Sequence, residues 1–347
     1  MRRDATATVL AVCATLLAGC GSTVTEPASG ANAAGPNATA PTGFPLEITN
    51  CGQMQTFEKP PTRAASMDQI STELLLHLNL QRSIVGTASR SGEVFGGGAG
   101  FPSLTDTYAQ RPVLAANYPS QEILLNAAPD FVTGNSDLYT FGPTTEGGTG
   151  FTRADMASQG IKTFTFLCKG EEATNDLLFS RYEEFGRIFG KGAEATAFVA
   201  KIRSSLAATA AVLAGATPVK TFYYQDGTGP LTTYGGGGQL DNGLKQAGGK
   251  GLFDDVPSLP TPTVTTEQVV ARNPDVIIIV NLGVREKDNA IPASKKAFLI
   301  STLGTSMNAV RNDRFCTMDF IGFTTGPRIA ATLAAIGPCL HPELNFG

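Results

Sequence analysis

The chain has 347 residues, which suffice for two domains of ordinary size or for one large one. Apolar residues make up 42% of it and charged residues 16%, so we expect a globular body whose surface is low in charge. The net charge is −4 and no run rich in lysine and arginine occurs, which argues against nucleic acid as a partner.

The first 19 residues have the pattern of a signal peptide. Arg2 and Arg3 precede an apolar stretch, residues 5–17, that is too short to span a membrane as a helix. The stretch ends in Leu-Ala-Gly-Cys, which resembles the lipobox of bacterial lipoproteins, where the cysteine is diacylated and becomes the first residue after cleavage. We therefore expect Cys20 to be lipidated, and ordinary secretion with a free cysteine is the alternative. On this interpretation the protein lies at the extracytoplasmic face of the cell membrane and touches the membrane only through its lipid.

Residues 20–43 have the composition of a flexible tether. Glycine, alanine, threonine, proline and asparagine dominate, with a single charge, so the segment cannot form a core.

The cysteines predict two disulfides. Once Cys13 is cleaved off with the signal peptide and Cys20 is acylated, four cysteines remain, an even number in an oxidising compartment. Three pairings are possible. We favour Cys51–Cys168 and Cys316–Cys339, because each bridge then lies within one half of the chain; a metal site is the alternative, but no CxxC spacing supports it. The remaining four cysteines are Cys51, Cys168, Cys316 and Cys339.

Strands and helices alternate from residue 44 onward, which predicts an α/β fold with mostly parallel sheets. The longest helical pattern, residues 175–214, is interrupted at residues 190–192. We expect a first lobe at 44–190, one long rigid connecting helix at 191–216, a second lobe at 217–347, and a ligand cleft between the lobes. We expect a hairpin at 46–57, strands at 63–67, 83–88, 161–166, 221–224, 276–280 and 315–320, and helices at 71–78, 152–158, 175–189, 193–213, 240–247, 294–303 and 327–336.

One local pattern occurs twice. Residues 120–132, SQEILLNAAPDFV, and residues 265–280, TTEQVVARNPDVIIIV, each contain a glutamate, six further residues, a Pro-Asp pair and a strand. The β-branched run at 276–280 is apolar enough for a strand covered on both faces. The repeat predicts two lobes built on one plan, although helix, Pro-Asp and strand in succession are also common in unrelated α/β folds.

The order of segments resembles the substrate-binding proteins of ABC importers for ferric siderophores, haem and cobalamin. The resemblance extends over nearly the whole chain after the tether, and no single piece would suffice. The matching pieces are residues 60–88, 118–132, 161–166, 239–256, 265–280, 303–319 and 324–343.

The resemblance implies two α/β lobes with modest closure on ligand, and a glutamate on each lobe that docks onto arginines of a permease dimer. Those positions match Glu122 and Glu267, the glutamates of the repeated pattern. Two carboxylates far apart on one body would set its register on a symmetric permease. The alternative is that both are ordinary acidic residues favoured at helix N-termini.

The sequence contains no catalytic motif, so we expect a binding protein that is not an enzyme and has no cofactor. There are only two histidines, His77 and His341, which argues against a bare-metal ligand such as zinc or manganese. We expect His77 to lie exposed or at a rim, and the glycines after Tyr234 to form a turn at the edge of the cleft.

A large metal chelate needs an open cleft with aromatic and arginine contacts from loops at the carboxyl ends of strands. On that basis the candidate ligand-binding residues are Met67, Asp68, Arg90, Tyr118, Tyr139, Tyr224, Tyr234, Arg285 and Arg328.

The sequence therefore predicts a lipid-anchored, monomeric receptor that captures an iron–siderophore complex and delivers it to an ABC permease. Cobalamin or haem is a second candidate ligand, and for haem no axial histidine is evident near a cleft loop. A sensory or structural lipoprotein of the same fold without a permease is a third interpretation.

Overall fold

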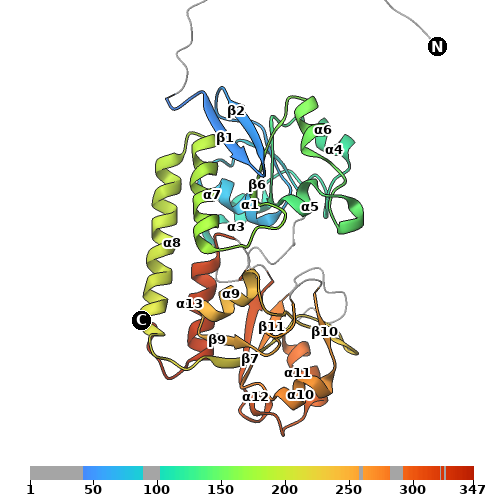
Figure 1. Ribbon diagram of the computed structural model, residues 1–347, viewed down its shortest axis with the longest axis vertical. Helices are drawn as coiled ribbons and strands as arrows, with labels where there is room; N and C mark the ends of the chain where they lie inside the picture. Colours follow the sequence, from blue (N-terminus) through green and yellow to red (C-terminus); the bar gives the residue numbers. More distant parts are fainter. Residues whose placement is uncertain (1–41, 89–101, 258–260, 282–291, 321, 324–325) are drawn as a thin grey trace, which may run out of the picture. The chain divides into compact units, whose positions relative to one another are not determined.

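The computed structural model describes residues 42–88, 102–257, 261–281, 292–320, 322–323 and 326–347, which belong to one compact unit that begins at Ala40. Two four-stranded parallel sheets organise this unit (Figure 1). The α/β class with two lobes and mostly parallel sheets is therefore confirmed. None of the helices in the described ranges is long and apolar enough to cross a bilayer.

The first sheet has the strand order β4-β3-β5-β6, and every neighbouring pair is parallel. Its central strands are short and wholly or mostly buried, as the apolar runs predict. The strands are β3 (Ala64–Ser66), β4 (Ile84–Thr87), β5 (Phe131–Ser136) and β6 (Lys162–Leu167). The helices around it are α1 (Gln69–His77), α3 (Thr105–Ala109), α4 (Gln121–Asn126), α5 (Asp137–Phe141), α6 (Arg153–Ser158) and α7 (Asn175–Ile188), with 3₁₀ turns η1 (Pro102–Leu104) and η2 (Thr144–Glu146).

The second sheet has the order β12-β11-β7-β9 and is also parallel throughout. Its central strand β11 is buried at five successive residues, so it is covered on both faces. The strands are β7 (Val219–Tyr224), β9 (Gly249–Gly251), β11 (Val276–Asn281) and β12 (Phe315–Asp319), with a small antiparallel pair β8 (Leu231–Thr232) and β10 (Thr263–Val264). The helices are α9 (Gln239–Gln246), α10 (Thr266–Arg272), α11 (Pro292–Leu303), α12 (Asn308–Arg311) and α13 (Ile329–Leu340).

A single long helix, α8 (Gly192–Val212), follows the last strand of the first sheet and precedes the first strand of the second. Helix α7 runs beside it (Figure 1). The break between them falls at Gly190, whose φ of +67° is readily adopted by glycine alone. The interruption expected at residues 190–192 is therefore confirmed, and we refer to the parts that carry the first and second sheets as the first and second lobes.

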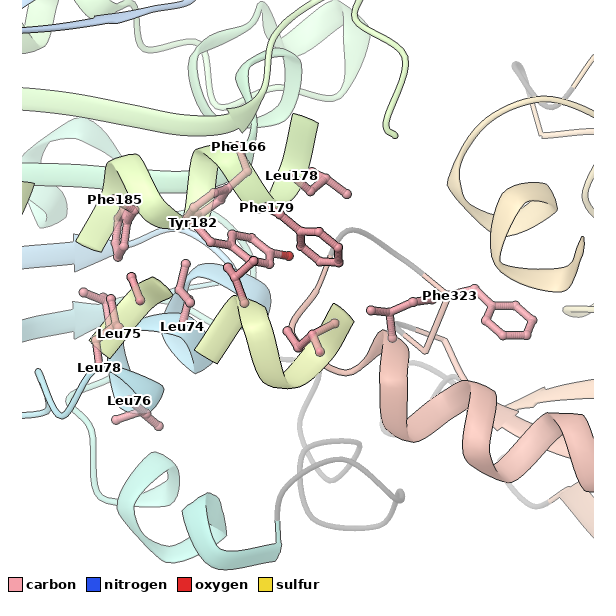
Figure 2. Packing of buried hydrophobic residues seen from close by; sticks show 14 of the residues in the cluster. Leu74, Leu75, Leu76, Leu78, Phe166, Leu178, Phe179, Tyr182, Phe185 and Phe323 are labelled. Atoms are coloured by element: carbon pink, nitrogen blue, oxygen red, sulfur yellow. The ribbon is translucent and has the colours of Figure 1, made fainter. Parts of the chain in front are cut away.

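The core of the first lobe is rich in aromatic side chains. Leucines of α1 lie opposite aromatic residues of α7 and β6 (Figure 2). The ring of Phe185 packs against Phe164 and Phe166, with centroids 5.7 and 5.2 Å apart. Large aromatic side chains each bury much apolar area, which stabilises this lobe despite its short strands.

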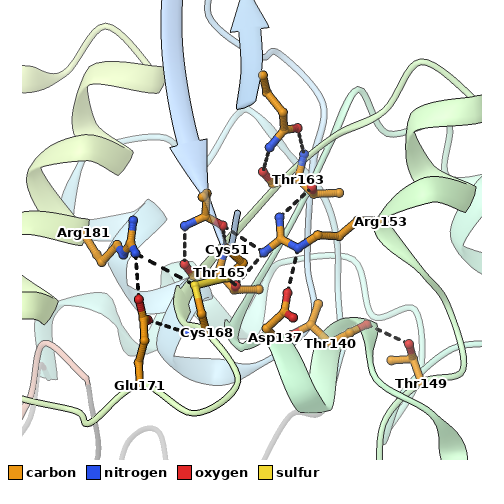
Figure 3. A network of polar contacts seen from close by, with 12 residues as sticks. Cys51, Asp137, Thr140, Thr149, Arg153, Thr163, Thr165, Cys168, Glu171 and Arg181 are labelled. Atoms are coloured by element: carbon orange, nitrogen blue, oxygen red, sulfur yellow. Dashed lines mark hydrogen bonds and ion pairs between the residues drawn. A yellow bond between two sulfur atoms is a disulfide. The ribbon is translucent and has the colours of Figure 1, made fainter. Parts of the chain in front are cut away.

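The edge strand β6 is covered by side-chain amides in place of a further strand. The hairpin of β1 (Leu46–Asn50) and β2 (Gln53–Phe57) lies beside it (Figure 3). Asn50 donates to the carbonyl of Thr165 and accepts from its amide, both at 2.9 Å, and Gln55 does the same at Thr163 at 2.7 and 2.9 Å. These two carboxamides satisfy backbone groups that an open edge would leave free for another chain.

Both disulfides form as expected. Cys51, in the turn of the hairpin, is bonded to Cys168 at the end of β6, and Cys316 in β12 is bonded to Cys339 in α13. Helix α13 runs to Leu340, beyond the end predicted at residue 336, even though Pro338 lies inside it. Arg314 explains the extension, because its guanidinium donates to the carbonyls of Cys339 and Leu340 at the end of the helix.

Candidate ligand site and docking residues

The carboxyl ends of the strands carry several of the expected ligand-binding residues. Met67 and Asp68 directly follow β3, Tyr139 lies in α5 directly after β5, and Tyr224 is the last residue of β7. Ligands of open parallel sheets bind at these strand ends, so the placement agrees with the geometry on which the residues were chosen.

Met67 and Asp68 offer a ligand little exposed surface, and Asp68 is half-buried. Met67 is fully buried among apolar side chains that include Leu124. Asp68 caps α1, where its carboxylate accepts from the amide of Ser71 at 2.9 Å, and its other oxygen accepts from the amide of Asn135. Burial raises the pKa of Asp68, and these hydrogen bonds oppose the rise.

The four expected tyrosines differ in access. Tyr139 is 44% exposed, whereas Tyr118 and Tyr234 are half-buried. Tyr234 packs edge-on against Tyr223 with ring centroids 4.7 Å apart, and burial raises its pKa. Tyr224 is completely buried and donates its hydroxyl hydrogen to the carbonyl of Gly227 at 2.8 Å. Tyr118, Tyr139 and Tyr234 therefore keep some exposed surface, whereas Tyr224 has none.

Arg328 is buried in an ion pair. Its Nε lies 2.9 and 3.0 Å from the two carboxylate oxygens of Glu73, and the side chains are 2% and 0% exposed. The structure thus places Arg328 against a residue 255 positions earlier in the chain and away from solvent. The other two arginines proposed from the sequence, Arg90 and Arg285, lie outside the described residues, as does the expected lipidation site Cys20.

A narrow crevice separates the N-terminal half of α7 from α9. Its lining includes Phe179, Tyr182, Gly243 and Phe323, and its volume of about 20 Å³ is that of a single water molecule. Asn175 donates to Gln246 across it at 2.8 Å. A metal chelate cannot enter this crevice, so it is not the ligand site in this conformation.

Sequence reasoning missed a buried lysine at the same strand ends. Lys295 in α11 is 1% exposed and donates to the carbonyls of Gln225 and Val280, at 2.6 and 2.7 Å. These carbonyls lie at the ends of β7 and β11, so the lysine ties the two central strands of the second sheet together. No motif surrounds it, and its role depends on two carbonyls 70 and 15 residues away.

The glutamates of the repeated pattern occupy equivalent, exposed positions. Glu122 is the second residue of α4, whose N-cap is Ser120, and Glu267 is the second residue of α10, whose N-cap is Thr265. Hydrogen bonds, first to its own backbone amide and then to Thr265, lower the pKa of Glu267.

The contacts that end the two helices are equivalent as well. Arg63 donates to the carbonyl of Ala127 at the end of α4, and Lys220 donates to the carbonyl of Arg272 at the end of α10. The amide of Asp130 donates to the carbonyl of Arg63 at 2.9 Å. In the second lobe the amide of Asp275 donates to the carbonyl of Lys220 at 2.8 Å.

The residues before the two prolines, Ala128 and Asn273, have φ values of +46° and +45°. The same backbone geometry thus recurs in both lobes, as the repeat predicts.

A family model described as periplasmic binding protein matches residues 65–321. The chain belongs to this family. No curated protein matches the sequence.

Solved structures agree with the family. A periplasmic binding protein from Veillonella parvula is 26% identical, with a TM-score of 0.68 over 86% of this chain and 97% of that one. A protein of an ABC-type Fe3+-hydroxamate transport system from Saccharomonospora viridis is 23% identical, with a TM-score of 0.65 and coverage of 85% and 99%. The haem-binding protein RhuT from Roseiflexus is 18% identical, with a TM-score of 0.64 and coverage of 81% and 98%.

As a member of the family, this periplasmic binding protein is extracytoplasmic, binds a small molecule and serves ABC import. Within the described residues, no group of three or more histidine, cysteine, aspartate or glutamate side chains could hold a bare metal ion.

Proposed function

We propose that this periplasmic binding protein captures an iron–siderophore complex and delivers it to an ABC permease, with Glu122 and Glu267 as the docking carboxylates and a lipid on Cys20 as its membrane anchor. The observation that carries the delivery step is the equivalence of the two glutamates. Both are exposed and follow the N-caps of matching helices in different lobes. Two equivalent charges of one sign suit a permease with two equivalent cationic sites.

Two features support a chelate as the cargo. The described residues offer no group of side chains that could hold a bare metal ion, and three of the expected tyrosines, Tyr118, Tyr139 and Tyr234, keep exposed surface, with Tyr139 the most exposed among them. Aromatic surface with a few polar groups suits a large amphiphilic ligand. The similarity to a structure from an Fe3+-hydroxamate transport system supports the same class.

Cobalamin or haem is the alternative cargo, and the similarity to the haem-binding protein of Roseiflexus supports haem as a candidate. Against haem, neither histidine is placed as an axial ligand. His77 is stacked on Phe198 with ring centroids 4.5 Å apart, and His341 is 2% exposed and engaged by Glu343 and the carbonyl of Gly248. A sensory or structural lipoprotein would keep the fold but would not need the paired glutamates.

Uptake of radioactive iron in the native bacterium tests the proposal. Deletion of the gene should abolish uptake of one class of ferric chelate, and the intact gene should restore it. A Cys20→Ser variant should restore less, because the protein is no longer held beside the permease. Undiminished uptake of every chelate in the deletion strain would contradict an iron-transport role.

A further inference from the structure

The buried ion pair of Glu73 and Arg328 connects the two lobes. Glu73 lies in α1, which directly follows β3 of the first sheet, and Arg328 is the N-cap of α13, which follows β12 of the second. The guanidinium Nε donates to both oxygens of the carboxylate, at 2.9 and 3.0 Å. Neither side chain is more than 2% exposed, so water screens this pair little.

Further polar groups fix each partner from its own lobe. Gln69, one turn earlier in α1, donates its amide to Glu73 at 3.0 Å. Asp319, the last residue of β12, lies 3.8 Å from Nη1 of Arg328. The arginine therefore stands between one carboxylate of each lobe. Burial raises the pKa of both carboxylates, and Arg328 opposes that rise at each of them.

A pair of this kind specifies geometry more than it adds stability. Removing two charges from water costs about as much as their attraction returns, so a buried ion pair contributes little net free energy, whereas a single unpaired partner is costly. The hydrogen bonds from a guanidinium are also directional. Apolar contacts, by contrast, tolerate sliding because the hydrophobic effect has no preferred direction.

We propose that Glu73 and Arg328 are positioning residues that hold the two lobes in one relative orientation before any ligand binds. A binding protein whose lobes are already oriented loses less entropy on capturing its ligand, and it presents its two docking helices at a constant separation. The inference does not depend on which ligand the protein takes, and it stands or falls separately from the iron–siderophore proposal.

Distances between spin labels on the two lobes test it. Ser158 in α6 and Ser301 in α11 are exposed, and the four cysteines of the described residues are all in disulfides. Labels at Ser158→Cys and Ser301→Cys in the full chain, with Cys13→Ser and Cys20→Ser, report the distribution of lobe separations by double electron–electron resonance. With Glu73 and Arg328 both intact, the labels should give one narrow distribution of distances.

A Glu73→Gln variant keeps a hydrogen-bond acceptor for Arg328 but removes the carboxylate charge that the first lobe places against it, and it should at least double the width of the distribution. The matched control is Asp137→Asn, which breaks the Arg153–Asp137 pair of 2.7 Å inside the first lobe, where the arginine is 6% exposed. Both variants should lower the melting temperature, but only Glu73→Gln should broaden the distances. Equal, narrow distributions for both variants would overturn the proposal.

A second variant tests the proposal if Glu73→Gln fails to fold. The double substitution Glu73→Leu with Arg328→Met replaces the pair with apolar side chains of similar size, a change that often preserves stability. It should fold, as judged by circular dichroism, and give the broad distribution. A narrow distribution would overturn the proposal. Failure of both variants to fold would overturn it as well, because the pair would then be a requirement of folding and not of orientation.

Discussion

Glu122 and Glu267 lie at the same position of two helices, one in each lobe, that begin and end with the same local contacts. Each glutamate is exposed two residues after a hydroxyl N-cap, and each helix is followed by a residue of positive φ and a Pro-Asp pair. The helix dipole favours an acid at any one helix N-terminus, whether or not another helix has one. A two-point docking surface, by contrast, requires equivalent acids in both lobes.

The docking role predicts that charge reversal at either glutamate separates delivery from capture. Glu122→Lys or Glu267→Lys should leave ligand affinity of the purified protein unchanged, because both residues are exposed at helix N-termini and neither is a candidate ligand-binding residue. Iron uptake in cells that carry the native permease should fall at least tenfold. Glu47→Lys, at an exposed position of β1, is the control, and a similar loss of uptake with it would contradict a specific docking role.

The amide cover of β6 predicts unequal costs for two similar substitutions. Asn50 is fully buried, exchanges two hydrogen bonds with Thr165 and accepts a third from Arg153, so Asn50→Ala should cost about 2–4 kcal/mol of unfolding free energy. Gln55 is only half-buried, and water can replace its bonds, so Gln55→Ala should cost about 1 kcal/mol. Urea unfolding followed by circular dichroism measures both. Equal costs would show that burial of the edge is not what makes Asn50 important.

The disulfides predict a large loss of stability on removal, because each closes a long loop. Cys51 and Cys168 are 117 residues apart, and Cys316 and Cys339 are 23 apart. Loss of loop closure should cost about 4–5 kcal/mol for paired alanine substitutions at the first bridge and about 3 kcal/mol at the second. The midpoints of urea unfolding of the two double variants check the order, and a larger loss at the shorter loop would contradict the chain-entropy explanation.

His77 predicts a loss of stability in mild acid. Burial, and secondarily the charges of Lys201 and Arg328, lower the pKa of His77 to about 4 from its usual 6.5. Between these pH values the unfolded chain binds the proton more readily than the folded one. The contribution of neutral His77 to the free energy of unfolding is therefore complete above pH 6.5 and is lost as the pH falls toward 4. Because solvent partly screens His77, we expect this loss of unfolding free energy to be about 1–3 kcal/mol.

Unfolding free energies of the wild type and of His77→Phe, measured from pH 7 to pH 4, isolate this contribution. The phenyl ring can keep the stack on Phe198 but cannot be protonated. The buried carboxylates Asp68, Glu73 and Asp319, whose pKa values burial raises, act in the opposite direction in both proteins and cancel in the difference. If the difference in unfolding free energy between the wild type and His77→Phe does not change with pH, the account is contradicted.

Most of the fold could be predicted from the sequence because its signals are local. The apolar run at 276–280 has the length and β-branching of a buried strand, and the glycines at 190 and 192 interrupt a helical period of apolar residues. The end of α13 could not be predicted, because Arg314 caps it from an adjoining strand region.

The candidate ligand site was only partly predictable, because access depends on the tertiary structure. Tyr139 and Tyr224 both lie at strand ends, yet one is exposed and the other is completely buried. Arg328 was selected as a ligand contact, and its partner Glu73 lies 255 residues away within an apolar helix. A glutamate on the buried face of such a helix is a signal that a cation lies opposite it, but the sequence does not identify that cation.

The most direct test of the central claim is a ligand titration of the purified protein followed by tyrosine fluorescence, since the chain has seven tyrosines and no tryptophan. The panel comprises hydroxamate, catecholate and citrate complexes of ferric iron together with haem and cyanocobalamin. We predict quenching with sub-micromolar affinity by one ferric chelate and none by its metal-free form. Saturable binding of haem or cobalamin alone would shift the assignment to the alternative cargo. Silence across the whole panel, from protein shown to be folded, would contradict the iron–siderophore account.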